Sequence, residues 1–175
     1  MTFSLPRAAL DQTDPDSCRD LFRMLVAGVG IVTAAGPSGP VGLTASSILA
    51  VSVAPPLVLV SLANGSRTLR TARRSSQFAA NLLPADQRPL ADRFANGRPA
   101  WARFADVELI SDRPPVLAVA LAAAVCDLVW TRRAGDHTLL LGQIHRLIPG
   151  VGQPLVWHDS AYHLLAGGQP IADSA

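Results

Sequence analysis

Short apolar runs alternate along this chain with clusters of Gly, Pro, Ser and Asp, and that spacing predicts a fold rich in β-strands. Residues 28–35 are apolar and β-branched, and residues 41–46 follow the turn sequence Gly-Pro-Ser-Gly-Pro, so we expect a β-hairpin there. Further strands are expected over residues 48–53, 57–62, 77–83, 116–131, 137–148, 154–157 and 161–164.

Three short helices are expected beside the strands. Asp16 or Ser17 can cap a helix that runs to about residue 27, Ser66 can cap one that runs to about Arg74, and residues 86–94 resemble a third. Because strands outnumber helices and follow one another through tight turns, the pattern predicts a mostly antiparallel sheet that closes into a barrel. We expect one domain over residues 15–166, between a flexible N-terminal arm (1–14) and a flexible tail (167–175).

Composition adds an expectation about assembly. Apolar residues make up 49% of the chain and charged residues 16%, against a usual charged share of about 25%. A spanning helix needs about 20 apolar residues, whereas the run over 116–126 ends at Asp127 and the run over 48–63 is interrupted by Pro55-Pro56. The acidic start also lacks the order of a signal peptide. We therefore expect a cytoplasmic homo-oligomer that covers apolar surface with a second subunit.

Several kinds of chemistry are not expected. All 15 basic residues are arginines, scattered among 13 acids and only nine aromatic residues, which does not favour nucleic-acid binding. Cys18 and Cys126 are too few for a disulfide framework, and His145, His158 and His163 lack partners at metal-ligand spacing. Neither a nucleophile elbow, a P-loop nor a Rossmann glycine motif is present. Glu108 is the single glutamate, which leaves paired-carboxylate catalysis without support.

The segment around residues 42–68 carries the strongest sign of ligand binding. A helix start attracts anions through its free amides, and Ser66 and Thr68 would add hydroxyl groups there while Arg67 or Arg70 adds charge. The strand end Thr44-Ala45-Ser46-Ser47 is small enough for a ligand to approach the backbone. The alternatives are an ordinary helix cap with solvated arginines, and an edge strand whose hydroxyl groups face water.

Two further polar residues are candidates. Asn81 lies in the middle of the expected strand 77–83, where its amide needs partners from a ligand or from a neighbouring loop. His137 opens a strand after a tight turn, where it could position a substrate or simply face solvent.

Taken in order, eight short motifs resemble the flavin reductase family, the reductase components of two-component flavin-dependent monooxygenases. They are Gly-Ile-Val-Thr-Ala (30–34), Gly-Leu-Thr-Ala-Ser-Ser (42–47), Pro-Pro-Leu-Val-Leu-Val (55–60), Ser-Arg-Thr (66–68), Phe-Ala-Ala-Asn (78–81), Leu-Ala-Asp-Arg-Phe-Ala (90–95), Gly-Asp-His-Thr (135–138) and Pro-Leu-Val-Trp (154–157). The resemblance covers about residues 17–165.

This resemblance implies a split β-barrel of the FMN-binding type, a homodimer, and an enzyme that reduces FMN or FAD with NADH or NADPH for a partner monooxygenase. By similarity, the flavin ring would be lined on one side by Thr44, Ala45, Ser46 and Ser47, and on its other side by Phe78, Ala79, Ala80 and Asn81. The edge of the ring would meet Ser61, Leu62 and Ala63, and the phosphate would meet Ser66, Arg67 and Thr68. His137 would lie beside the nicotinamide as the catalytic residue.

Other functions stay open on the sequence. A split barrel that carries or senses flavin without meeting nicotinamide would show the same motifs, because neither needs a nucleotide-binding domain. A split-barrel oxidase acting on a phosphorylated pyridine, or an interaction module without flavin, are further alternatives. The sequence does not distinguish FMN from FAD or NADH from NADPH.

Overall fold

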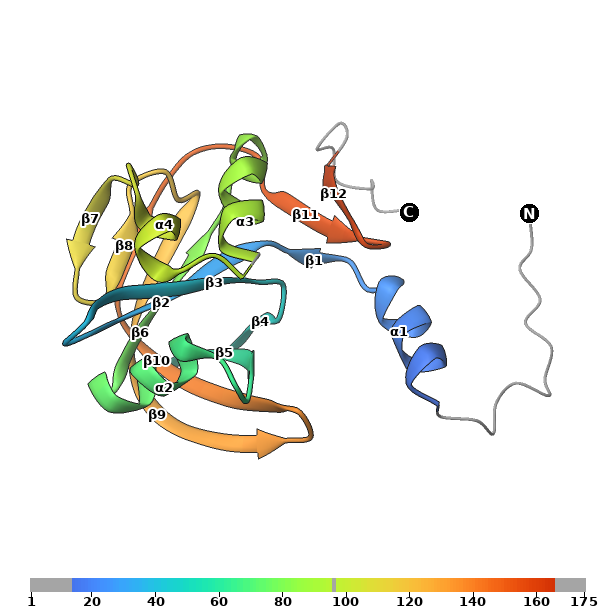
Figure 1. The fold of residues 1–175 in the computed structure, drawn as a ribbon, viewed down its shortest axis with the longest axis horizontal. Helices are drawn as coiled ribbons and strands as arrows, with labels where there is room; N and C mark the ends of the chain where they lie inside the picture. Colours follow the sequence, from blue (N-terminus) through green and yellow to red (C-terminus); the bar gives the residue numbers. More distant parts are fainter. Residues whose placement is uncertain (1–13, 96, 166–175) are drawn as a thin grey trace.

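The computed structural model describes residues 14–95 and 97–165, and β-strands dominate this part of the chain (Figure 1). Seven antiparallel strands form the main sheet in the order β3-β2-β6-β9-β10-β5-β4, while β1, β11 and β12 form a small sheet and β7 pairs with β8. The strands are β1 (Ala27–Gly28), β2 (Gly30–Gly36), β3 (Gly39–Ala45), β4 (Ile48–Val53), β5 (Pro56–Ala63), β6 (Gln77–Leu82), β7 (Leu109–Asp112), β8 (Pro115–Leu117), β9 (Ala122–Ala134), β10 (His137–Pro149), β11 (Leu155–His158) and β12 (Ala161–Leu164). The helices are α1 (Pro15–Arg23), α2 (Arg67–Ser75), α3 (Arg88–Ala95) and α4 (Ala100–Phe104), with a 3-10 turn, η2, at Ala85–Gln87.

Tight turns set the register of the main sheet. Gly39 and Gly135 have positive φ angles of 93° and 61°, a conformation that glycine adopts without strain, at the β2–β3 and β9–β10 turns. The expected hairpin over residues 28–46 is confirmed, because Thr33 lies opposite Gly42 on neighbouring antiparallel strands. At the other end of the sheet, His137 begins β10 opposite Ala63 of β5.

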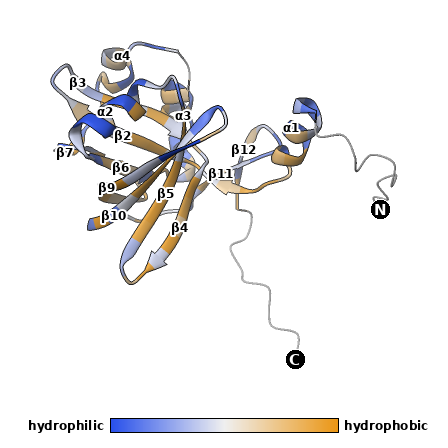
Figure 2. Ribbon diagram, turned by 90° about the horizontal axis from the view of Figure 1, so that it is seen from below, coloured by the Kyte–Doolittle hydropathy of each residue, from blue (hydrophilic) through white to orange (hydrophobic). Residues whose placement is uncertain are grey.

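The main core lies inside the curved sheet, and α2 closes it. Alternate residues of β5 are buried, as expected for a strand with one covered face. Strand β2 is covered on both faces, since Val32 and Ala34 join the core under α2 whereas Ile31 joins a second core under α3. In Figure 2 the outer side of α2 is hydrophilic while β4 and β5 are largely hydrophobic. The core under α2 contains Val32, Ala34, Val41, Ala45, Val58, Val60, Leu62, Leu69, Ala72, Phe78, Cys126 and Leu140.

One buried amide joins three strands beneath these cores. The Asn81 Nδ2 group of β6 donates to the Ile31 carbonyl oxygen at 3.0 Å and to Thr33 Oγ1 at 3.2 Å, both on β2. Its Oδ1 accepts the backbone N–H of Leu117 on β8 at 2.9 Å. The Thr33 hydroxyl also donates to the Pro115 carbonyl oxygen. Asn81 therefore finds its partners within the protein, on two strands and not on the ligand or the loop that the sequence left open.

The first helix differs from the prediction at both ends. Asp14 is its cap, because the Asp14 carboxylate accepts the backbone N–H groups of Asp16 and Ser17 and so draws both into the first turn. The helix ends at Arg23 instead of residue 27, because Ala27 already pairs with Trp157 of β11.

The predicted strand over 116–131 is wrong as a single element. It is divided into β8 and β9, which pair with different strands, β7 and β6 respectively. A turn between them is fixed by the hydrogen bond from the Ala120 N–H to the Leu117 carbonyl oxygen. The structure also contains β7 and α4, which the sequence pattern did not predict. The arm over residues 1–13 and the tail over 166–175 lie outside the described residues.

Helix α1 stands away from the main sheet, joined to it through β1 (Figure 1). None of its residues is buried: Leu21 and Phe22 of the helix expose 64% and 63% of their surface, and Leu25, just after the helix, exposes 62%. Over residues 14–95 and 97–165, no helix combines the length and apolar character needed to cross a membrane.

Candidate functional site

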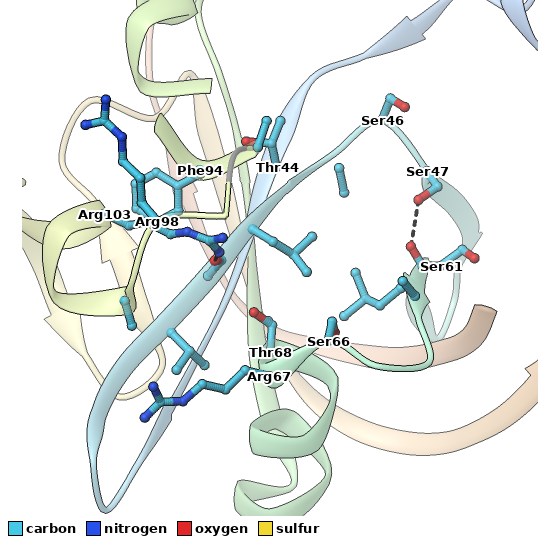
Figure 3. A pocket seen from close by; sticks show the side chains of 18 of the residues that line it. Thr44, Ser46, Ser47, Ser61, Ser66, Arg67, Thr68, Phe94, Arg98 and Arg103 are labelled. Carbon is cyan, nitrogen blue, oxygen red and sulfur yellow. Dashed lines mark hydrogen bonds between the residues drawn. The ribbon is translucent and has the colours of Figure 1, made fainter. Parts of the chain in front are cut away.

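A pocket of about 570 Å³ opens beside the edge strand β3 (Figure 3). Its volume lies within the range of about 300–1,000 Å³ that is usual for small-molecule sites. Its walls come from the ends of β3 and β5, the start of α2, the first residue of β10 and the segment from α3 to α4. Four of the five predicted groups line it: Thr44, Ala45, Ser46 and Ser47; Ser61, Leu62 and Ala63; Ser66, Arg67 and Thr68; and His137.

The start of α2 forms one end of the pocket. Ser66 is the cap of the helix, as predicted, and its Oγ accepts the Leu69 N–H at 3.0 Å. Thr68 is 2% exposed and sits in the first turn, while Arg67 is exposed at the rim. Helix amides, hydroxyl groups and a guanidinium group thus meet at one point, which is a favourable environment for a phosphate.

The loop before α2 is fixed to the turn that carries His137. The Asn64 Nδ2 group donates to the Gly135 carbonyl oxygen at 3.0 Å, and Asn64 Oδ1 accepts the Thr138 hydroxyl at 2.8 Å. These bonds tie the start of α2 to the turn that carries His137. Sequence reasoning missed Asn64, although its place between a buried strand and a glycine was a turn signal.

His137 lies at the edge of the pocket with 46% of its side chain exposed. Its Nδ1 is 2.8 Å from Asp136 Oδ1. The hydrogen bond with His137, together with the positive charge of the ring when protonated, lowers the pKa of Asp136 below its ordinary value. The carboxylate therefore orients the imidazole and leaves Nε2 for another partner.

Serine residues of β5 and of the segment just after β3 form the opposite rim. Ser47 Oγ donates to the Ser61 carbonyl oxygen at 2.8 Å, and the Ser61 N–H donates to the Ser47 carbonyl oxygen at 3.1 Å. Deeper in the pocket, Thr44 Oγ1 donates to the Ala91 carbonyl oxygen of α3 at 2.6 Å. These bonds join the end of β3 to both β5 and α3, so the small residues between them keep their backbone open to a ligand.

The α3–α4 segment supplies a wall that the sequence did not reveal. Phe94, Arg98 and Arg103 line it, and Figure 3 places them together on the side away from Ser47 and Ser61. Phe94 packs edge-on against Phe104, with ring centroids 4.9 Å apart. A side chain at Gly42 would meet this wall, since an added Cβ would lie 3.0 Å from Phe94 Cε1. The glycine in the motif over 42–47 was the available signal for such a close approach.

The predicted group on β6 does not reach the pocket. Phe78, Ala79, Ala80 and Asn81 are at most 3% exposed and pack in the cores or in the amide network described above. We therefore leave them out of the site proposed below.

The charges of the pocket are of one sign. The described residues that line it include Arg67, Arg98 and Arg103 but no Asp or Glu. Burial lowers the pKa of Arg103 below its ordinary value. Such a pocket concentrates positive potential and selects anions. Across residues 14–95 and 97–165, no group of three or more His, Cys, Asp or Glu side chains could hold a metal ion.

Comparison with known sequences shows to which family the chain belongs. The family model "Flavin reductase like domain" matches residues 22–166. The chain belongs to this family. Among curated flavin reductases, it is 35% identical over 146 residues to FMN reductase (NADH) SmoA of Agrobacterium fabrum, a match that covers 83% of each chain.

Solved flavin reductases share the fold. The chain superposes on the NADH:FAD oxidoreductase SgcE6 of Streptomyces globisporus C-1027 with a TM-score of 0.84 and 28% identity, over 93% of this chain and 99% of SgcE6. For BorF, the flavin reductase component of a bacterial two-component tryptophan halogenase, the TM-score is 0.79 at 29% identity, over 87% and 98% of the two chains. The predicted split β-barrel is therefore confirmed.

Proposed function

We propose that this protein is an NAD(P)H:flavin oxidoreductase, which transfers hydride to FMN or FAD and supplies the reduced flavin to a separate oxygenase. The observation that carries this proposal is the joining of a phosphate-type helix start, a small-residue strand end and an oriented histidine in one cationic pocket. The named activities of SmoA and SgcE6 support the same reaction.

The residues present fit a phosphorylated flavin. The start of α2, with Ser66, Arg67 and Thr68, would hold the phosphate. The open backbone at residues 44–47 and 61–63 would lie against the ring system, because small side chains there let a flat ligand approach main-chain amides.

The protein contributes binding and orientation to this reaction. Bound flavin supplies the hydride-accepting chemistry, so the chain needs no acid–base pair of its own. His137, oriented by Asp136, would position the nicotinamide carboxamide through Nε2. Hydroxyl and main-chain contacts at the exposed rim formed by Ser46 and Ser47 are compatible with release of the product.

Reduced flavin would pass to a monooxygenase or a related oxygenase. BorF is named as the reductase component of such a two-component system, which supports a similar division of labour. Both cysteines are free thiols, which fits the reducing cytoplasm as the compartment.

We further propose that the protein is a homodimer. The apolar face of α1 finds no cover within residues 14–95 and 97–165, and a mean hydropathy of +0.28 is high for a chain of this kind. A cavity between α1 and Trp157 shares Ser46 and Ser47 with the site pocket, so a second subunit on α1 would lie near the flavin.

Anaerobic mixing of the purified protein with flavin and NADH or NADPH tests the reaction. We expect the flavin absorbance to bleach much faster with the protein than without it, for at least one pair of substrates. Flavin binding without faster bleaching would instead support a flavin carrier. Failure to bind either flavin would exclude both functions.

A further inference from the structure

The pocket carries more positive charge than one flavin phosphate requires. The start of α2 already offers amides, two hydroxyl groups and Arg67 to a phosphate. Arg98 and Arg103 line a different wall, which belongs to the α3–α4 segment (Figure 3). No carboxylate stands among the described lining residues of this wall, so the wall can attract an anionic group in addition to the phosphate at the start of α2.

The two arginines differ in burial and in how firmly their side chains are held. Arg103 is half-buried on α4, and its Nη1 donates to the Gly42 carbonyl oxygen on the open edge of β3 at 2.7 Å. This bond fixes the direction of the guanidinium group before any ligand arrives. Arg98 is exposed in the loop before α4, where its long side chain can turn toward a ligand. A guanidinium fork suits two oxygens of one phosphate, so an anchored and a movable arginine together form a reasonable phosphate clamp.

We propose that Arg98 and Arg103 bind the second phosphate of a dinucleotide, the group that FAD or NADH has and that FMN or reduced nicotinamide mononucleotide lacks. The inference rests on the proposed flavin reductase function and deepens it, because it names the residues that recognise the adenylate half of a substrate. Where FAD supplies the second phosphate, these arginines set the preference for FAD over FMN.

The test compares dinucleotides with mononucleotides in three variants. Arg98→Gln and Arg103→Gln remove one guanidinium each, and Arg98→Lys keeps the charge but removes the fork. Arg146→Gln is the matched control, since Arg146 is exposed on β10 and does not line the pocket. Dissociation constants for FAD and FMN are measured by flavin fluorescence, and KM values for NADH and reduced nicotinamide mononucleotide by steady-state assay.

We expect Arg98→Gln to weaken FAD binding about tenfold, since the variant loses a charge-assisted hydrogen bond. FMN binding should change about twofold or less, and Arg98→Lys should recover part of the loss. A rise in the KM for NADH alone would also support the proposal, because the second phosphate bound by the arginines would then be that of NADH. Arg146→Gln should leave all four values unchanged.

Equal weakening of FAD and FMN, or unchanged values for both dinucleotides, would overturn the inference. Should Arg103→Gln lower the melting temperature, the exposed Arg98 still decides the question. Failure of the proposed function itself would look different, since the wild-type protein would then bleach no flavin.

Discussion

At the scale of single residues, Thr68 is the most direct test of the phosphate end, because it is buried at the start of α2 and lines the pocket. We predict that Thr68→Val weakens flavin binding about fivefold, through the loss of a hydrogen bond worth about 1 kcal/mol. Titration of the apoprotein with flavin measures the effect. Thr71→Val, one turn later on α2 and outside this pocket, is the control. Equal affinities in both variants would place the phosphate elsewhere.

His137 allows a separate prediction about the second substrate. Since its ring is oriented by Asp136 at the pocket edge, His137→Ala should raise the KM for NADH several-fold more than the dissociation constant for flavin. Asp136→Asn, which keeps the ring but removes the charged partner, should have a smaller effect of the same kind. A parallel change of both constants would count against the assigned role.

The buried thiol of Cys126 predicts a dependence of stability on pH. Burial, and secondarily the charge of Asp127, raises the pKa of Cys126 from 9.0 to about 12. Above pH 9 the unfolded chain loses this proton while the folded chain keeps it. The contribution of the protonated thiol to the free energy of unfolding is therefore fully present below pH 9 and declines as the pH rises toward 12. Urea unfolding between pH 8 and about 11 should show a shallower decline for Cys126→Ala than for the wild type. Identical slopes would contradict the shifted pKa.

At the scale of elements, β10 meets the core through a glycine. A Cβ added at Gly142 would lie 2.5 Å from Phe78 Cζ on β6. We predict that Gly142→Ala lowers the free energy of unfolding by about 1–3 kcal/mol through overpacking. Gly28→Ala is the control, since an added Cβ there meets nothing within 4 Å. Phe78→Leu combined with Gly142→Ala should cost less than the sum of the two single changes, whereas strict additivity would show that the added methyl group does not collide with the Phe78 ring.

The elements also show which features of the fold could be predicted from the sequence. The Ser66 cap, the turn at Gly39 and the alternation of β5 were predictable because each depends on residues close together in the chain. The division of residues 116–131 was not, since an unbroken apolar run looks the same whether it pairs with one strand or with two. Likewise, Arg98 and Arg103 reach the pocket through the packing of Phe94 against β3, which no local pattern encodes.

At the scale of the whole molecule, α1 predicts the state of assembly. We expect a mass in solution of twice the 18.4 kDa chain, measured by light scattering after gel filtration. Phe22→Asp on α1, combined with Leu25→Asp just after it, should shift the protein to the monomer, because two charges would enter an apolar interface. Asp20→Asn, a polar change on the same helix, should not. Since α1 buries none of its residues within the subunit, a loss of the fold itself is not expected.

A monomeric wild-type protein would contradict the proposed homodimer. It would leave the fold and the pocket of one subunit unaffected, since the lining residues described above all belong to a single chain.

The Asn81 network has a consequence for the strength of ligand binding. Because one amide ties β2, β6 and β8 together before any ligand arrives, the scaffold beneath the pocket is already rigid. The entropy lost on ligand entry is then confined to a few rim side chains, each costing about 0.5–1.5 kcal/mol. A surface that is ordered before the ligand arrives strengthens binding by lowering this entropic cost. A structural asparagine that lies outside the pocket thus contributes to the affinity of the site.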